Sequence, residues 1–463
     1  AIFKSLAGVY MSSSNSLGRG VSLIDATSLV VGSIIGTGVF LKSATMAQQV
    51  GSPSWVLIVW IFSGLLSLAG ALTYAELGAM FPRAGGEYVY LREAYGDIPA
   101  FLYGWTRFWI AGPATIAAYA VGASTFLDGA ISLQSFGGKV AVGFVFIVFF
   151  TSLNCLQVSV GGRLQSFITG VKLLMMAALI FGVLFFSESA GLSNLTAPEG
   201  ASAMTISGFG LAMLSALWAY DGWNNLPMAA GEVKNPGKNV PLSLIVGVLT
   251  VLVIYLLINF GYFLALPFTE AISANSDLDP NALPIATKAA ITFLGPAAVG
   301  IVSIGFVISA LGAMNGSVLT GARVSYAMAS DRLFFRQLGF VHPKTSVPVV
   351  SILCQGMIAS AMAFMGSFDQ LSNYVVFSSW IFYGLVCAGV FVLRKKRPDL
   401  ERPYKTLGYP VVPAIFVLVS IFLVGNTIWE LPKDTGIGIF LIALGIPVYY
   451  AFRNFWKKDR IPR

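Results

Sequence analysis

Charged residues are scarce in this chain of 463 residues. Only 10% of the residues are Asp, Glu, Lys or Arg, whereas soluble domains carry about 25%. Hydrophobic residues make up 56% of the chain, and its mean hydropathy is +0.80. This composition excludes an ordinary soluble protein and predicts a polytopic membrane protein.

Histidine and cysteine are also rare. Cys155, Cys354 and Cys387 all lie inside apolar segments, where none is placed for a disulfide or a cysteine-based metal site. The single histidine, His342, leaves too little material for a zinc site or a histidine-based catalytic centre. We therefore expect no enzyme activity, no metal and no cofactor. The net charge of +8 does not indicate a nucleic-acid partner, because the basic residues gather at the ends of apolar segments.

Long apolar runs predict twelve transmembrane helices, since each run suffices to cross about 30 Å of hydrocarbon. The runs fall at about 22–49, 54–81, 99–128, 138–157, 164–186, 205–231, 241–266, 296–322, 347–366, 371–393, 409–428 and 435–455. Most of the 28 Lys and Arg residues then lie on the side of the N-terminus. This asymmetry predicts a protein of the cell membrane with both termini in the cytoplasm.

Three glycines, Gly32, Gly36 and Gly38, interrupt the first apolar run. Each interior glycine costs a helix about 1 kcal/mol relative to alanine, so the cluster needs a reason. One reason is an unwound backbone, which a membrane tolerates only beside protein or a watery cavity. The other is close helix packing through Gly32 and Gly36, which are four residues apart.

The sixth apolar run repeats this anomaly and favours unwinding. Between Ser215 and Asn225 it carries an acid and a glycine, Asp221 and Gly222, in the middle of the run. Interrupted helices at matching places in two inverted halves indicate the midplane binding site of a transporter.

The two interruptions predict a ligand with two charged ends. Amides freed at Gly32–Gly38, at the positive end of a helix dipole, suit a carboxylate. Carbonyls freed at the end of the first half-helix and from Trp218 to Asp221 suit an ammonium group. Together they describe a zwitterionic α-amino acid.

These features resemble the amino acid–polyamine–organocation superfamily over about residues 20–430. The resemblance rests on Gly32–Gly38, Tyr74–Gly78 with Pro82, Gly85–Tyr88, Glu232 with Asn235 and Pro236, Arg323 with Ser330–Arg332, Pro343 with Lys344, and Arg402–Tyr404. The segment Trp218–Asn224 is similar to the sixth helix of the L-amino-acid transporter family. Among bacterial members, the chain is most similar to the alanine–serine–cysteine exchangers.

The resemblance implies an all-α, leucine-transporter-type fold. This fold has a five-plus-five inverted repeat and two further C-terminal helices, and its first and sixth helices are unwound in mid-membrane. The expected division of the chain is a cytosolic tail at 1–21, a first repeat at 22–190, a second repeat at 205–395, the last two helices at 409–455 and a cytosolic tail at 456–463.

The same resemblance implies the site residues. The substrate carboxylate would be held by Gly36, Thr37 and Gly38, and the substrate amine by Ile34, Trp218, Ala219 and Asp221. Trp218 stands where the family has an aromatic gate over the substrate. Animal members are joined to a heavy subunit through a Cys in the loop after the third span. The corresponding loop here, about 129–139, has no Cys, so no disulfide-linked heavy subunit is expected.

Three basic residues fall at membrane depth, namely Lys42, Arg107 and Lys172. Lys172 is nine residues past Arg163 and therefore about 14 Å deep, which is far for a lysine to snorkel. A lysine there costs roughly 3 kcal/mol, which favours a functional role. In sodium-independent relatives a lysine here takes the place of the sodium ion and bridges the first and eighth spans, so we expect no sodium.

The remaining ionisable residues are weaker candidates. Glu76 and Glu232, at the cytoplasmic ends of their spans, are expected to pair with Arg83 or Arg323. Glu232 and Tyr255 are secondary candidates for a role in coupling.

The sequence thus favours a sodium-independent exchanger of small neutral L-amino acids that works by alternating access. Proton-coupled uptake is an alternative, because Lys172 could carry a proton. Cationic substrates are another, through the carboxylate of Asp221. A cation channel would need an acidic ring that the chain lacks.

Overall fold

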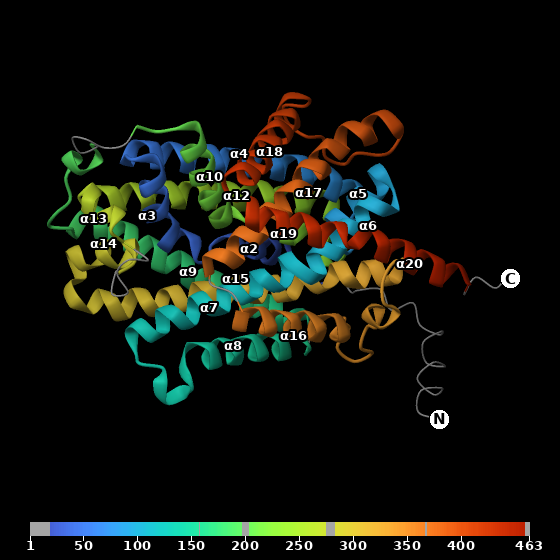
Figure 1. Ribbon diagram of the computed structural model, residues 1–463, viewed down its shortest axis with the longest axis horizontal. Coiled ribbons are helices and arrows are strands. Elements are labelled where there is room, and N and C mark those ends of the chain that lie inside the picture. The colour runs from blue at the N-terminus through green and yellow to red at the C-terminus, as the bar shows by residue number, and fades with distance from the viewer. Residues whose placement is uncertain (1–18, 157, 197–202, 275–282, 366–367, 459–463) are drawn as a thin grey trace.

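The computed structural model describes residues 19–156, 158–196, 203–274, 283–365 and 368–458. Within these residues the chain folds as helices, and its one β pairing is an isolated bridge between Val21 and Val233. Most of the long helices run roughly along the long axis of the molecule (Figure 1). The prediction of an all-helical protein is confirmed.

In the first half of the chain, all helices but one follow the predicted apolar runs. The helices of this half are α2 (Leu23–Ile34), α3 (Gly38–Val50), α4 (Pro53–Met80), α5 (Glu87–Tyr95), α6 (Asp97–Thr106), the π-helical turn η1 (Arg107–Ala111), α7 (Gly112–Ala130), α8 (Gly138–Asn154) and α9 (Val158–Phe186). Helix α5 is the exception and lies in the predicted connection between the second and third runs.

The second half contains more short helices. They are α10 (Ile206–Tyr220), α11 (Asn225–Met228), α12 (Pro236–Ala265), α13 (Phe268–Ile272), α14 (Ile285–Leu294), α15 (Ala298–Ser330), α16 (Val349–Met365), α17 (Phe368–Lys396), α18 (Val411–Glu430), α19 (Pro432–Ala443) and α20 (Gly445–Lys458). The last predicted run is two helices rather than one, because Gly445 and Pro447 disfavour a continuous helix.

Nine helical segments of the described residues are long and apolar enough to cross a membrane. Three shorter apolar helices, α8, α10 and α16, occupy the fourth, sixth and ninth predicted runs. Twelve membrane crossings stay a prediction.

The ends of the first helices have clear local causes. Ser22 and Asp25 form a capping box that starts α2, and Ser52 caps α4 with Pro53 in its first turn. Helix α3 ends at Gly51, whose φ of 73° closes the last turn in the left-handed conformation.

Both glycine-containing runs are interrupted at the predicted places. Helix α2 ends at Ile34 and α3 begins at Gly38, whereas α10 ends at Tyr220 and α11 begins only at Asn225. In the second interruption Gly222 has a φ of 113°, and a Cβ built there would lie 2.7 Å from the carbonyl oxygen of Ser33. Only glycine permits this conformation and this close approach, so the two interrupted segments are packed against each other.

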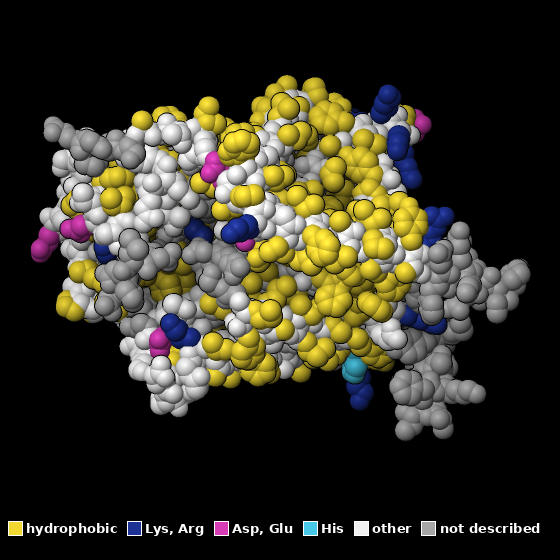
Figure 2. Space-filling model, in the orientation of Figure 1, with side chains coloured by type: hydrophobic (Ala, Val, Ile, Leu, Met, Phe, Trp, Pro, Cys, Tyr) yellow, Lys and Arg dark blue, Asp and Glu magenta, His cyan; other side chains and the backbone are white. Residues whose placement is uncertain are grey.

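Long helices surround the interruptions. Helix α12 packs along α4 and α2, α15 packs along α7 and α9, and α3 packs against α10. On the face seen in Figure 2, hydrophobic side chains cover the surface from the middle of the molecule toward the end that carries α5 and α20, and Lys and Arg lie at that end and at scattered places elsewhere. Exposed apolar side chains of this kind are what a lipid-facing surface requires.

Candidate functional site

Lys172 of α9 is completely buried and bound to the end of α2. Its Nζ donates to the carbonyl oxygens of Gly32 at 2.8 Å and Ile35 at 2.6 Å, and its exposed fraction is 0%. The alternative of a lysine snorkelling to the surface is therefore wrong. Its ammonium satisfies carbonyls that the end of a helix otherwise leaves unpaired.

Helix α15 also binds carbonyls of this segment and shares that of Ile35 with Lys172. Ser309 donates to the carbonyl of Ile35 at 3.2 Å and of Gly36 at 2.9 Å. A Cβ built on Gly312 would lie 2.8 Å from Cε of Lys172, so the lysine stem runs directly against α15. The lysine thus lies between the first and eighth predicted spans. It hydrogen-bonds to the first and makes van der Waals contact with the eighth.

Tyr255 of α12 joins the two interrupted segments. Its hydroxyl lies 3.0 Å from the carbonyl oxygen of Ile34 and 3.0 Å from that of Ala219. Both carbonyls belong to the predicted amine-binding set. A hydroxyl has one proton and donates to one of them at a time, so these oxygens keep capacity to accept further donors.

Trp218 lies over the beginning of α3. Its Nε1 donates to Oγ1 of Thr37 at 3.4 Å, and its ring lies 5.8 Å from that of Tyr119 on α7. The side chain of Trp218 is 3% exposed. The predicted gate residue and a predicted carboxylate-binding residue are therefore in direct contact.

The two glycines of the predicted carboxylate set are tightly enclosed. A Cβ on Gly36 would lie 2.9 Å from Cε1 of Tyr119. A Cβ on Gly38 would lie 2.4 Å from Cβ and 2.6 Å from Cα of Ala219. Gly38 thus lets α3 and α10 touch, so close packing and helix interruption both operate in this stretch. The first amides of α3 have no intrahelical acceptor, and they lie at the positive end of its dipole.

Asp221 begins the second interruption, and its carboxylate is buried. Oδ1 accepts a hydrogen bond from the hydroxyl of Tyr383 on α17 at 2.8 Å, and the exposed fraction of Asp221 is 9%. Its backbone amide donates to the carbonyl of Trp218 at 3.2 Å, so this predicted amine-binding carbonyl also has an internal donor.

A buried polar group beside Asp221 escaped the sequence analysis. Asn224 donates to Oε1 of Glu87 on α5 at 2.7 Å, and Arg107 of η1 donates to Oδ1 of Asn225 at 3.3 Å. Glu87 is 0% exposed and Arg107 is 5% exposed. Arg107 at membrane depth and Glu87 in the Gly85–Tyr88 motif were the available signals, but neither indicated a partner.

Glu87 lies in α5, outside the helical segments long enough to cross a membrane. Burial raises the pKa of Glu87 to about 6, although the hydrogen bond from Asn224 and the nearby charge of Arg107 oppose the rise. Its Oε2 is buried without a hydrogen-bond partner among the described residues. This carboxyl is therefore suited to exchange a proton near neutral pH.

The predicted pair between Glu232 and Arg323 is confirmed. Arg323 Nε lies 2.9 Å from Glu232 Oε1, and both side chains are 1% exposed. The pair joins the end of α15 to the segment after α11.

The predicted partner of Glu76 is wrong. Glu76 pairs with Arg394 at 2.7 Å and with Arg402 at 3.4 Å. Arg83 instead pairs with Glu93 of α5 at 2.6 Å. The end of α4 packs against α17, which brings Arg394 to Glu76, whereas the loop after Pro82 carries Arg83 toward α5.

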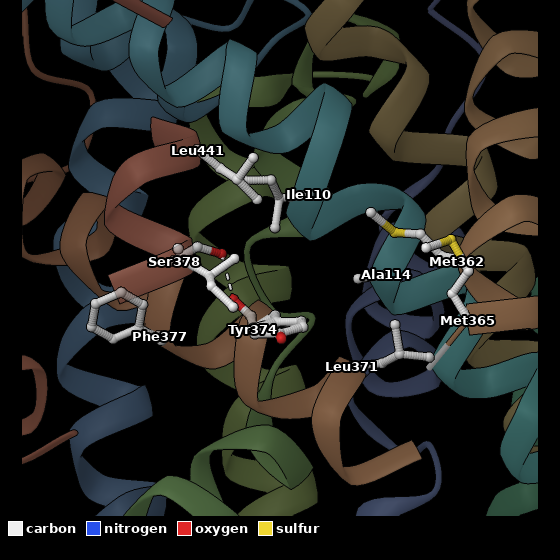
Figure 3. A pocket seen from close by; sticks show the side chains of 11 residues that line it. Ile110, Ala114, Met362, Met365, Leu371, Tyr374, Phe377, Ser378 and Leu441 are labelled. Carbon is white, nitrogen blue, oxygen red and sulfur yellow. Dashed lines mark hydrogen bonds between the residues drawn. The ribbon is translucent and has the colours of Figure 1, made fainter. Parts of the chain in front are cut away.

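A cavity of about 270 Å³ lies apart from the interrupted segments, between α7, α16, α17 and α19. Figure 3 shows its apolar lining, which includes Ile110, Met362, Leu371 and Leu441. The hydroxyl of Ser378 donates to the carbonyl of Tyr374 at 2.7 Å. None of the lining residues is charged, so this cavity does not suit the two ends of a zwitterion.

No metal site accompanies these groups. Within the described ranges, no cluster of three or more His, Cys, Asp and Glu side chains is arranged to hold an ion.

Comparisons with known proteins show the family of this chain. The model of the amino acid permease family matches residues 21–452. The chain is 34% identical to the serine/threonine exchanger SteT of Bacillus subtilis (strain 168), over 95% of this chain and 98% of that protein. It is 31% identical to the b(0,+)-type amino acid transporter 1 of Mus musculus, over 96% and 89% of the two chains. It is also 31% identical to the cystine/glutamate transporter of Homo sapiens, over 96% and 87%.

Proposed function

This chain belongs to the amino acid permease family, in the L-amino-acid transporter branch of the amino acid–polyamine–organocation superfamily, and we propose that it exchanges small neutral L-amino acids across the cell membrane without sodium. It is a membrane transporter of amino acids and not an enzyme. By the charge asymmetry of the sequence both termini are cytoplasmic, and without a Cys in 129–139 no disulfide-linked heavy subunit is needed.

The hydroxyl of Tyr255 carries this proposal. It brings the carbonyls of Ile34 and Ala219 together from two different spans, beside the glycine amides that start α3. Acceptors and donors so arranged match the ammonium and the carboxylate that all α-amino acids share. In this proposal Gly36, Thr37 and Gly38 hold the carboxylate, and the carbonyls of Ile34, Trp218, Ala219 and Asp221 hold the amine.

The enclosure of the site supports small substrates. Trp218 and Tyr119 lie in contact range of each other above the glycines, so a substrate must fit under two aromatic rings. Trp218 acts as the gate in this proposal. The name of one relative, a serine/threonine exchanger, agrees with small substrates and with exchange.

The position of Lys172 supports sodium independence. In sodium-coupled transporters, unwound carbonyls bind the ion. Here the carbonyls of Gly32 and Ile35 already accept hydrogen bonds from the lysine side chain. A lysine in this place occupies the oxygen ligands that a sodium ion would need.

Proton-coupled uptake is the second candidate, and Glu87 favours it. This buried carboxyl has a pKa of about 6 and is bound to Asn224 in the second interruption. A proton taken up by Glu87 would change its hydrogen bond with Asn224 and therefore its hold on the second interruption. Exchange requires an amino acid on the opposite side of the membrane, whereas proton symport does not.

Counterflow in proteoliposomes tests the proposal. Uptake of radiolabelled alanine should require unlabelled alanine or serine inside, and it should not change when choline replaces sodium. Steep sodium dependence would overturn the assignment of Lys172. Uptake into empty vesicles driven by an inward proton gradient would instead establish symport.

Blocked substrates test the two ends separately. Alanine methyl ester and N-acetylalanine each lose a set of charged hydrogen bonds worth about 1.5–3 kcal/mol, and they should compete at least about tenfold more weakly than alanine. Equal competition by either derivative would show that the backbone does not hold that end of the substrate.

A further inference from the structure

Arg107 is a buried guanidinium near two acids, Asp221 and Glu87. It interacts electrostatically with both, although within the described ranges neither carboxylate comes within the 4.0 Å of an ion pair. Its Nη2 donates to Oδ1 of Asn225, and its Nε is buried without a hydrogen-bond partner among the described residues. An arginine in proteins is always charged, so a positive charge is permanently fixed at this place.

Arg107 also lies close to the second interruption. It donates to Asn225, and it lines a small cavity together with Tyr383, whose hydroxyl donates to Asp221. The neighbouring Tyr119 packs against the positions of Gly36 and Trp218. The second interruption therefore joins Arg107 to the proposed substrate site.

The surroundings of Arg107 leave room for a small polar group. A cavity of about 10 Å³ is lined by Arg107, Tyr103, Ser379 and Tyr383. This is about the size of one water molecule. The Nε of Arg107, which lines this cavity, has no hydrogen-bond partner in the described part of the chain.

We propose that Arg107 is the residue that sets the charge preference for the substrate side chain. It offsets the carboxylate of Asp221, so that the site accepts uncharged side chains with hydrogen-bond acceptors and rejects cationic ones. This inference rests on the proposed function, because it assigns the side-chain end of the same site.

The charges of Asp221 and Arg107 decide which substrate side chains are attracted. An unopposed Asp221 at the end of α10 would attract a cationic side chain. Arg107 and Tyr383, which donates to Oδ1, both stabilise this carboxylate in part. A second cation would meet like charge in a place with little water, and like-charge contacts cost several kcal/mol in comparable interfaces. A hydroxyl, in contrast, could accept from the unpaired Nε of Arg107.

The test compares substrates of one size and different charge. The competitors of alanine exchange are 2-aminobutyrate, which is neutral, and 2,4-diaminobutyrate, which is cationic. In the wild type the cationic compound should compete at least about tenfold more weakly. In Arg107→Gln the difference in competition between the neutral and the cationic compound should shrink at least about tenfold, because no arginine then offsets the charge of Asp221. Arg83→Gln, which removes an exposed arginine paired with Glu93, should keep the wild-type difference.

Removing the other charge should have the reciprocal effect. Asp221→Asn leaves Arg107 uncompensated, so aspartate should compete at least about tenfold better than against the wild type. The double variant Arg107→Gln/Asp221→Asn should have neither preference. These measurements keep the test valid if Arg107→Gln fails to fold.

The outcomes distinguish a failure of the role proposed for Arg107 from a failure of the proposed function. An Arg107→Gln protein that exchanges alanine but has the wild-type difference in competition would show that Arg107 is only structural, and would overturn this inference alone. An Asp221→Asn protein that exchanges alanine without better competition by aspartate would do the same. A wild-type protein that exchanges no amino acid at all would instead overturn the proposed function.

Discussion

The two interrupted helices are built in opposite ways. At the first interruption, between α2 and α3, the protein binds backbone carbonyls with side chains from three other helices. These side chains are Lys172, Ser309 and Tyr255. At the second, after α10, the interrupted segment supplies the side chains itself. These are Asp221, Asn224 and Asn225, which bind Tyr383, Glu87 and Arg107.

This difference matches the two parts of an amino acid. Every α-amino acid has the same ammonium and carboxylate, and a backbone fixed by buried donors can bind them without regard to the side chain. The variable part needs protein side chains that can differ in charge and size. We therefore propose that the backbone of both interruptions binds the constant end of the substrate and that the side chains of the second interruption face its variable end.

Replacing Lys172 should have the largest effect, because the first interruption depends on it. Lys172→Met leaves the carbonyl of Gly32 without its donor and that of Ile35 with Ser309 alone, and a buried unpaired group costs about 1–3 kcal/mol. Alanine exchange should fall at least tenfold, and the melting temperature should fall with it.

Lys288→Met is the matched control for this change. Lys288 also donates to a carbonyl, that of Glu270 at 3.1 Å, but it does so at the surface. Its loss should change stability by about 0.5 kcal/mol or less. Wild-type exchange by Lys172→Met would show that the first interruption holds its shape without the lysine.

A methyl group on Gly38 should have the next largest effect. Gly38→Ala places a Cβ 2.6 Å from Cα of Ala219, where the obstacle is backbone. Overpacking of this kind costs about 1–3 kcal/mol and should separate α3 from α10. Exchange and melting temperature should therefore fall together, which is measured on the same purified protein.

Gly170→Ala is the control, because a Cβ built on Gly170 of α9 meets nothing within 4 Å. It should behave as the wild type. If Gly38→Ala kept full stability and lost only binding, the glycine would serve the substrate alone and not the packing of the two segments.

The local part of this architecture could be predicted from the sequence. Hydropathy places the helices, and clustered glycines or an acid in an apolar run mark both interruptions. The depth of Lys172 follows from counting residues along α9. These signals are local, and they need no knowledge of how distant helices pack.

The contacts of the second interruption could not be predicted in this way. Glu87 and Asn224 are 137 residues apart, and Asp221 and Tyr383 are 162 apart. The wrong partner for Glu76 has the same cause, since Arg394 is 318 residues away. Such pairs arise from tertiary packing, which a single sequence does not encode at any fixed spacing.

Two tyrosines on α12 allow a matched comparison at the first interruption, with a smaller expected effect. Tyr255→Phe removes the hydroxyl between the carbonyls of Ile34 and Ala219, which costs about 0.5–1.5 kcal/mol. Affinity for alanine should fall about two- to tenfold. Tyr262→Phe should leave affinity unchanged, because the hydroxyl of Tyr262 has no partner among the described residues. Equal effects of the two changes would remove Tyr255 from the site.

A change of pH isolates the second interruption, because Glu87 is bound to Asn224 there. The pKa of Glu87 is raised from 4.5 to about 6, so the folded protein binds this proton more tightly than the unfolded chain. Its contribution to stability is complete below pH 4.5 and is lost as pH rises through 6, by about 2 kcal/mol in all. The melting temperature should therefore fall between pH 5 and pH 7.5 by an amount that Glu87→Gln lacks. The glutamine oxygen still accepts from Asn224, so the fold is kept. Glu93→Gln, on the same helix, should retain the wild-type pH dependence. An identical pH dependence in the wild type and in Glu87→Gln would show that Glu87 is not the proton-binding group, and with it the case for proton coupling at the second interruption would fail.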